Sequence, residues 1–227
     1  YANMFVHEFV HALGGSKGKK IKDESRGLFA MKPGQTERNF EGPFVNVTTE
    51  TNPSLIRWKY WIDPTTPIPT PNTDEYAGKV GLFDGANYYT AGWYRPSKSC
   101  TMGSFTSWND MPPLCEVCCE ALVLRIHELV SLVAERSFDT SGKFTTFTVS
   151  PPQPMDHKLK IRWTINDKAV PLADDATTFE FRDNNLAPGR YTLGVEVVNV
   201  SPVVRFDPDK LLDQSYEWIL AVFNDAD

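Results

Sequence analysis

Two histidines four residues apart constrain this chain more than any other feature. They lie in the segment Val6-His-Glu-Phe-Val-His11. On an α-helix, residues i and i+4 share one face, so both imidazoles point toward the same place. Imidazoles in this arrangement are typical zinc ligands, and the glutamate between them is left to act as a general base toward water. The segment therefore predicts a helix in which His7 and His11 bind Zn²⁺ and Glu8 supports hydrolysis.

The neighbours of this motif are almost all apolar, and they predict a buried helix. Gly14 and Gly15 follow and can adopt the left-handed conformation that ends helices. Burying two imidazoles and a carboxylate is costly unless something compensates, and a metal ion is the natural compensator. The alternative is a pair of core histidines that hydrogen-bond to the backbone. The prediction of burial rests on Met4, Phe5, Val6, Phe9, Val10, Ala12 and Leu13.

A long run rich in glycine and aromatic residues follows further along the chain. It comprises Val80-Gly-Leu-Phe-Asp-Gly-Ala-Asn-Tyr-Tyr89, Gly92-Trp-Tyr-Arg-Pro-Ser97 and Cys100-Thr-Met102, and the motif Cys115-Glu-Val-Cys118 comes after it. Together with the histidine motif, the Gly-Gly pair and Thr66-Pro-Ile-Pro-Thr-Pro71, this run resembles the IgA-peptidase family of secreted zinc metallopeptidases. The resemblance covers roughly residues 1–135.

The resemblance implies a metzincin-like catalytic domain. In such a domain His7 and His11 are zinc ligands, Glu8 is the general base, and Met102 forms a methionine turn beneath the metal. A phenol beside the metal could stabilise the oxyanion of the reaction. Tyr94, just ahead of the methionine turn, is the first choice for this role, and the alternatives are Tyr88 and Tyr89.

The third zinc ligand is the point at which the chain departs from the family. Family members usually have an aspartate two residues after the Gly-Gly pair, whereas here a lysine-rich stretch separates that pair from Asp23 and Glu24. A longer loop costs only about 0.6 kcal/mol of closure entropy for each doubling of its length, so Asp23 could still reach the metal. We therefore predict Asp23 as the third ligand, with Glu24 as the neighbouring candidate. The alternative is a solvated loop that contributes no ligand.

Charge and hydropathy restrict the partners of the chain. It has 29 acidic and 23 basic residues and a formal net charge of -6, which argues against nucleic-acid binding. No apolar run is long enough to span a bilayer. The resemblance implies a protein or peptide substrate and a secreted or cell-envelope location, extracellular or periplasmic. Because a zinc peptidase normally has a β-sheet ahead of its active-site helix, we expect this chain to be the carboxy-terminal part of a longer polypeptide.

The four cysteines are Cys100, Cys115, Cys118 and Cys119. Their spacing is a poor match to a four-cysteine zinc site. We predict instead a disulfide from Cys100 to either Cys115 or Cys118, which would tie the methionine turn to the next helix and imply an oxidising compartment. The alternative is a set of reduced thiols buried in a core.

Hydrophobic periodicity changes along the chain. Apolar residues recur at helical spacing over residues 116–136 and predict a helix, in which His127 is expected to be a surface or capping residue rather than a metal ligand. Runs of period two, with Trp163 in the second of them, resemble an immunoglobulin-like or fibronectin type III-like sandwich. These predicted strands cover residues 144–149, 159–165, 178–181, 190–198 and 216–222.

The sequence therefore predicts an α+β protein of two domains. Residues 1–140 are expected to form a metzincin-like zinc metallopeptidase domain that lacks its amino-terminal part here, and residues 141–227 an Ig-like β-sandwich. The predicted function is that of a secreted zinc-dependent endopeptidase, which hydrolyses peptide bonds with metal-activated water. The alternative is a non-catalytic binding or adhesion protein that keeps the peptidase fold with a degenerate metal site.

Overall fold

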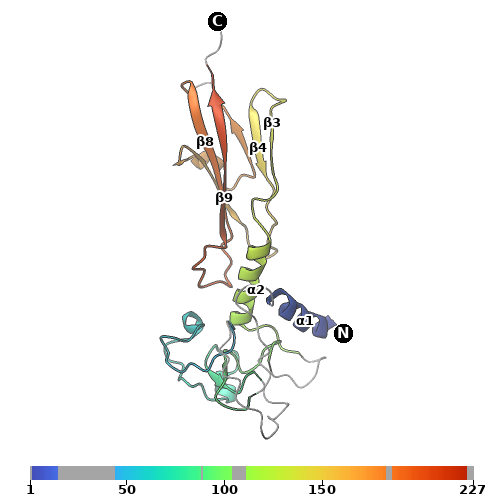
Figure 1. Ribbon diagram of the computed structural model, residues 1–227, viewed down its shortest axis with the longest axis vertical. Coiled ribbons are helices and arrows are strands. Elements are labelled where there is room, and N and C mark those ends of the chain that lie inside the picture. Colours follow the sequence, from blue (N-terminus) through green and yellow to red (C-terminus); the bar gives the residue numbers. More distant parts are fainter. Residues whose placement is uncertain (1, 15–43, 88, 104–110, 183–185, 224–227) are drawn as a thin grey trace. The chain divides into compact units, whose positions relative to one another are not determined.

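The computed structural model describes residues 2–14, 44–87, 89–103, 111–182 and 186–223. The chain divides into two compact units (Figure 1). Unit 1 contains the described residues up to Ile126 together with Val203–Phe206. Unit 2 contains His127–Pro202 and the described residues from Asp207 onward. No helix among the described residues combines the length and the apolar character that a membrane span requires.

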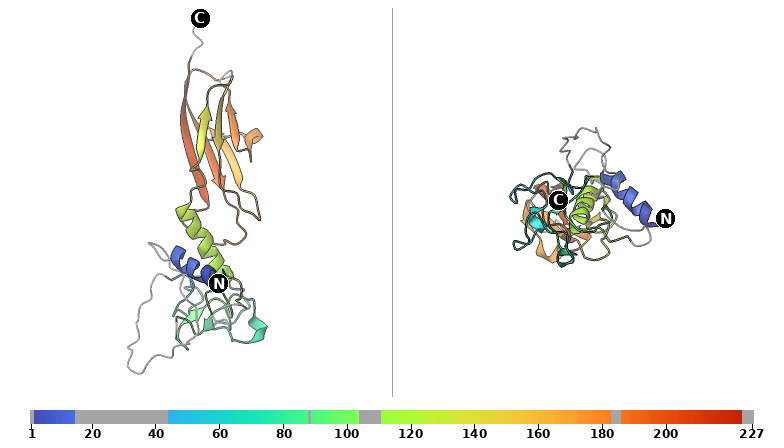
Figure 2. Two further views of the ribbon diagram at one scale, coloured as in Figure 1. Left: turned by 90° about the vertical axis from the view of Figure 1, so that its right-hand side faces the viewer. Right: turned by 90° about the horizontal axis from the view of Figure 1, so that it is seen from below.

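Unit 2 is built from two antiparallel β-sheets (Figure 2). One has the order β3-β4-β7, and the other has the order β6-β5-β8-β9. The longest pairing joins β8 to β9, with Gly189 opposite Val222 and Val198 opposite Asp213. Five of the strands, β4, β5, β7, β8 and β9, lie where the period-two runs predicted them, whereas β3 and β6 were not predicted. Their bounds are β3 Arg136–Asp139, β4 Thr145–Val149, β5 Lys160–Ile165, β6 Lys168–Ala169, β7 Thr178–Phe181, β8 Gly189–Val198 and β9 Asp213–Val222, with a 3-10 helix η3 at Pro171–Ala173.

Trp163 lies at the centre of the core that the two sheets of unit 2 share. Successive residues of a strand point to opposite faces, and in β5 the buried positions alternate with exposed ones. The Trp163 ring stacks on Phe179 of β7 and on Trp218 of β9, with ring centroids 5.3 and 6.0 Å away. Its indole N–H donates a hydrogen bond of 2.9 Å to the Ala176 carbonyl. One side chain therefore contacts both sheets and leaves no polar atom of its own unsatisfied.

The described residues of unit 1 contain few regular elements. Two of these are α-helices: α1, Ala2–Gly14, and α2, Glu116–Leu129, whose residues from His127 onward belong to unit 2. Between them stand two single-turn 3-10 helices and one short strand pair, in which Phe83 faces Arg95. These elements are η1 Lys59–Trp61, η2 Asp74–Tyr76, β1 Phe83–Asp84 and β2 Tyr94–Arg95.

The loops of unit 1 are held by hydrogen bonds from side chains to backbone carbonyls. The buried Trp58 donates from its indole N–H to the Gly81 carbonyl at 2.7 Å, and the buried Arg95 guanidinium donates to the Asp84 carbonyl at 2.6 Å. Gly81 is required by close approach, because a Cβ atom there would lie 2.3 Å from Thr70 Oγ1. The glycine and aromatic run is therefore a structural frame for unit 1.

The predicted α+β fold class, with its metzincin-like domain, is wrong. Among the described residues there are two α-helices against nine β-strands, so the fold is mainly β. The described residues between 44 and 113 form loops joined by short elements and no helix-and-sheet layer. The sequence of that stretch has no sustained hydrophobic periodicity. The expectation of a metzincin-like α+β domain there came from the family resemblance alone. The second helix begins at Glu116 as predicted but ends at Leu129, before residue 136.

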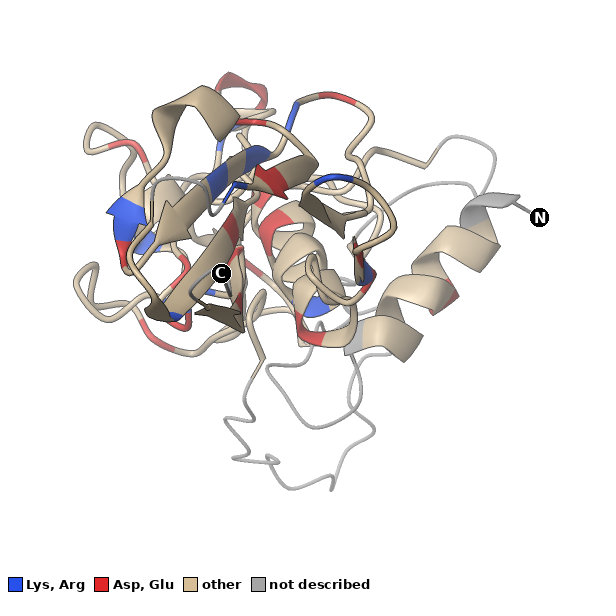
Figure 3. Cartoon of the chain, turned by 90° about the horizontal axis from the view of Figure 1, so that it is seen from above, with Lys and Arg blue, Asp and Glu red and all other residues tan. Residues whose placement is uncertain are grey.

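The prediction that the first helix is buried is also wrong. Val10 and His7 are only 1% and 6% exposed, but Phe5 is 69% exposed and Phe9 is 46% exposed. The two phenylalanine rings stack on each other with centroids 5.9 Å apart. The helix beside the N label in Figure 3 is uncharged except for one acidic position, Glu8. Thus only one side of α1 packs against the core of unit 1, and the exposed side of the helix is also apolar.

Replacing Trp163 tests the core of unit 2. We expect Trp163→Ala to lower the free energy of unfolding of unit 2 by about 3–5 kcal/mol, because it opens a cavity between the sheets and leaves the Ala176 carbonyl without its donor. Denaturant unfolding followed by circular dichroism would measure the loss. Leu172→Ala, at a fully exposed position of the same unit, is the control and should change stability by no more than about 0.5 kcal/mol. Equal effects of the two substitutions would contradict this description of the core.

Candidate metal centre

The two histidines of α1 face each other one helical turn apart. Their Nε2 atoms are 3.2 Å apart, and their rings meet edge to face with centroids 4.8 Å apart and an interplanar angle of 81°. Two imidazole nitrogens at this distance share either a proton or a metal ion. Nitrogens bound to a tetrahedral zinc ion at about 2.0–2.1 Å lie about 3.3 Å from each other, so the spacing of His7 and His11 fits that ion.

A backbone carbonyl fixes the ring of His7. The imidazole Nδ1–H donates a buried hydrogen bond of 2.7 Å to the Thr101 carbonyl oxygen. Because a carbonyl only accepts, the proton of the neutral ring is on Nδ1, and Nε2 presents its lone pair toward His11. Metal-binding histidines are commonly oriented by such a contact on their second nitrogen.

The carbonyl that holds His7 belongs to a tight turn, Cys100–Gly103. A hydrogen bond of 2.8 Å between the first and last residues closes the turn. Thr101 anchors it twice, since its hydroxyl donates to the Pro112 carbonyl at 2.6 Å and its backbone N–H donates to the Pro113 carbonyl at 3.1 Å. The Met102 side chain is fully buried beneath the turn. The position of the Thr101 carbonyl is therefore set by a segment eleven residues away in the sequence.

Core packing and a helix-end contact position α1 in unit 1. Val10, one turn from His7, packs in the same core cluster as Met102 and the first turn of α2. At the end of α1, Arg125 donates from Nε to the Leu13 carbonyl at 2.8 Å. Carbonyls at a helix end have no partner within the helix and carry partial negative charge, so a guanidinium stabilises them.

Glu8 and Tyr94, the predicted catalytic residues, both lie on described elements. Glu8 follows His7 on α1, and its side chain is exposed. Tyr94 is half-buried in β2, packs against the core that includes Val10, and has its backbone paired with Thr48 through hydrogen bonds of 2.7 and 3.0 Å. The alternative Tyr89 stacks on Trp93.

Other predicted candidates do not join the histidine pair within the described structure. Asp23, Glu24 and Tyr88 lie outside the described residues. In the part of the chain that is described, no third His, Cys, Asp or Glu ligand atom converges on the two imidazoles. His127 belongs to unit 2, where its Nε2 accepts a hydrogen bond of 2.9 Å from the Asn199 amide.

Sequence reasoning missed two features of this region. The first is the role of Thr101, which acts through its backbone carbonyl and so carries no side-chain signal. The second is the convergence of three buried cysteines, Cys100, Cys115 and Cys118, whose sulfurs all lie within 4.8 Å of one another and could hold a metal ion. The predicted disulfide is not formed, because all four cysteines are free thiols.

A separate pocket of about 490 Å³ lies in unit 1 between residues 54–60 and one side of α2. Apolar side chains such as Phe44, Ile56 and Leu124 contribute to its lining. Of the predicted catalytic and metal-binding residues that the structure describes, His7, Glu8, His11 and Tyr94, none lines it.

Comparison with protein families matches part of the chain. The sequence model of the family described as IgA Peptidase M64 matches residues 72–126. The matched stretch includes Tyr94, the turn Cys100–Gly103 and most of α2, and it supports a peptidase function. The histidine pair lies outside it. A search of curated proteins finds no match.

The Thr101 hydroxyl offers a test of how the turn is held. Thr101→Val keeps the shape of the side chain but removes the donor to the Pro112 carbonyl, so we expect unit 1 to lose about 1–3 kcal/mol of unfolding free energy. Urea unfolding followed by tryptophan fluorescence would measure this. Thr51→Val, at an exposed threonine of the same unit, should change stability by no more than about 0.5 kcal/mol. If the two variants were equally stable, the turn would not depend on this hydrogen bond.

Proposed function

We propose that this chain carries the active site of a zinc-dependent endopeptidase. The family match supports peptidase function. The observation that carries the metal-dependent part of the proposal is the spacing of 3.2 Å between the Nε2 atoms of His7 and His11. A secreted or cell-envelope location, with proteins or peptides as substrates, belongs to the same proposal.

His7 and His11 would hold the zinc ion through their Nε2 atoms. His7 is suited to this role because its Nδ1 proton is already committed to the Thr101 carbonyl. The burial of His7 also favours a metal, since a buried polar ring needs partners on both nitrogens. Asp23 is our proposed third ligand, and Glu24 is the neighbouring candidate. A catalytic zinc site has three protein ligands and keeps one position for water or substrate.

Zinc bound there would polarise a substrate carbonyl and lower the pKa of water, which makes water a nucleophile near neutral pH. Glu8 would accept the proton of the attacking water and deliver it to the amine that leaves. Its exposure on α1, next to the buried His7, leaves the carboxylate accessible to solvent and substrate. Tyr94 would donate its phenolic proton in a hydrogen bond to the developing oxyanion.

Glu8→Gln separates chemistry from metal binding. The amide keeps the size of the carboxylate but cannot accept the proton, so we expect zinc content to be unchanged and hydrolysis of a labelled unfolded protein to fall by about 10²–10⁴-fold. Elemental analysis and a fluorescence cleavage assay would give the two values. His11→Ala is the matched variant, and it should lose both the zinc and the activity. Wild-type cleavage by Glu8→Gln would reject the assignment of the base.

Asp23→Ala tests the third ligand. If Asp23 completes the site, the substitution should weaken zinc binding severely, because each ligand is one of only three from the protein. Competition with a chromophoric chelator would measure the affinity, and far-ultraviolet circular dichroism would show that the sheets of unit 2 remain folded. Glu24→Ala is the neighbouring control. Unchanged zinc affinity in both variants would favour the non-catalytic binding protein over the peptidase.

A further inference from the structure

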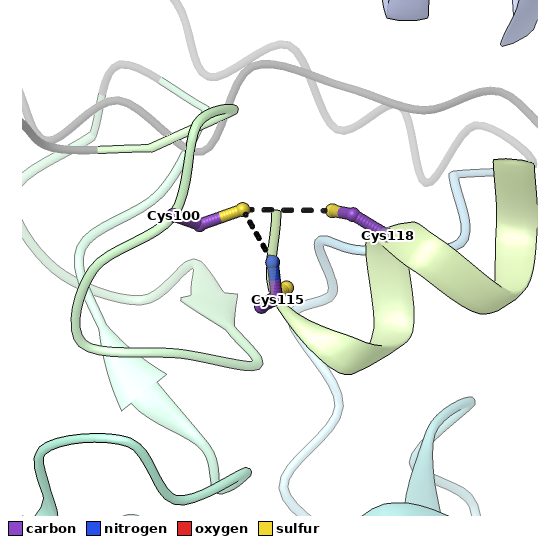
Figure 4. A group of neighbouring side chains, drawn as sticks. All are labelled: Cys100, Cys115 and Cys118. Atoms are coloured by element: carbon purple, nitrogen blue, oxygen red, sulfur yellow. Dashed lines mark hydrogen bonds between the residues drawn. The ribbon is translucent and has the colours of Figure 1, made fainter. Parts of the chain in front are cut away.

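Three cysteine side chains from two segments converge in the core of unit 1. Cys100 is the first residue of the turn Cys100–Gly103, Cys115 immediately precedes α2, and Cys118 is in the first turn of α2. All three are buried. Figure 4 shows the side chains of Cys100 and Cys118 pointing toward each other, and their sulfurs are 3.8 Å apart. The three sulfurs therefore surround one small volume.

Hydrogen bonds from N–H groups point at these sulfurs. Cys100 Sγ accepts from the backbone N–H of Met102 at 3.4 Å and from that of Cys115 at 3.3 Å. Cys118 Sγ accepts from the side-chain amide of Asn46 at 3.4 Å. A thiol is a weak acceptor and a thiolate a strong one, so such donors favour the ionised form. They are the contacts expected around sulfurs that bind a metal.

Burial sets an electrostatic condition on these thiols, because all three lie in the core of unit 1. A buried negative charge is costly unless a cation accompanies it. A metal ion among the three sulfurs would supply that cation.

The distances distinguish a metal site from a disulfide. A disulfide joins two sulfurs at about 2.05 Å and leaves a third without a role. Two thiolates that each lie about 2.3 Å from a tetrahedral metal ion are about 3.8 Å apart. The separation of Cys100 and Cys118 equals this spacing, and Cys115 lies within the same 4.8 Å limit. Cys115 and Cys118 also have the Cys-x-x-Cys spacing common in thiolate metal sites.

We propose that Cys100, Cys115 and Cys118 together bind one thiophilic metal ion, Zn²⁺ or Cu⁺, at a site distinct from the histidine pair. Thiolate sulfur favours these soft and borderline ions over Mg²⁺ or Ca²⁺. Among the described residues no imidazole or carboxylate joins the three sulfurs. The site is structural: it fastens the turn that holds His7 to the start of α2. It does not depend on the proposed hydrolysis.

Cobalt spectroscopy on the reduced full chain tests this proposal. Co²⁺ is the spectroscopic stand-in for Zn²⁺, and thiolate ligands give it a near-ultraviolet charge-transfer absorption that nitrogen and oxygen ligands do not give. We expect this absorption in the wild type and in His11→Ala, and we expect Zn²⁺ to abolish it. Cys118→Ser should lose it. Cys119→Ser is the matched control, because Cys119 is adjacent but outside the three-sulfur group, and it should keep the absorption.

Two further measurements make the outcome decisive. In a separate arm, Cu⁺ is titrated against a chromophoric chelator, and Cys-dependent binding of one Cu⁺ without the cobalt absorption would assign the site to copper. X-ray absorption of the metal-loaded wild type, which needs no variant, should show sulfur neighbours at about 2.3 Å. The proposal is overturned if neither metal binds in a cysteine-dependent way, or if mass spectrometry finds Cys100 in a disulfide that blocks binding. Loss of peptidase activity alone would bear only on the histidine site.

Discussion

The hydrogen bond from His7 Nδ1–H to the Thr101 carbonyl is the contact on which the candidate site depends. It joins residues 94 positions apart in the sequence, and both of its atoms are buried. It fixes the tautomer of His7 and directs Nε2 toward His11. A displacement of the turn Cys100–Gly103 would rotate the ring and separate the two nitrogens. The distance between the two histidine nitrogens therefore depends on the position of that turn.

Several independent contacts hold the turn in place. Thr101 donates hydrogen bonds to two proline carbonyls, Met102 is buried in the core, and Cys100 Sγ accepts from the backbone N–H of Cys115, just before α2. A metal ion among the three cysteine sulfurs would add a strong link at the same point. In that proposed arrangement the cysteines would position the turn, the turn positions His7, and the two histidines would hold the catalytic metal. The structural metal and the catalytic metal would have separate ligands, but both sites would depend on the turn Cys100–Gly103.

The two units maintain their structures by different means. Unit 2 has a continuous apolar core between two sheets, with Trp163 in contact with both. The described part of unit 1 has only short strands, and its loops are fixed by buried side chains with polar groups, such as Trp58 and Arg95. Cross-links contribute most to the stability of a unit with little regular structure, because each one lowers the conformational entropy of the unfolded chain. When the cross-link is a metal ion, its binding free energy also adds to the free energy of folding. Metal binding in unit 1 is consistent with that need.

The sequence by itself determined the elements that depend on local periodicity. The five period-two runs, the start of α2 at Glu116 and the helix that presents His7 and His11 on one face were all predicted, because these patterns require only neighbouring residues. Tertiary structure alone decided that Phe5 is exposed, that a backbone carbonyl holds His7, and that Cys100 meets both Cys115 and Cys118 as free thiols. The predicted α+β class failed for the same reason. Contacts between distant segments follow the paths of loops, and loops of unit 1 carry no periodic signal from which those paths could be inferred.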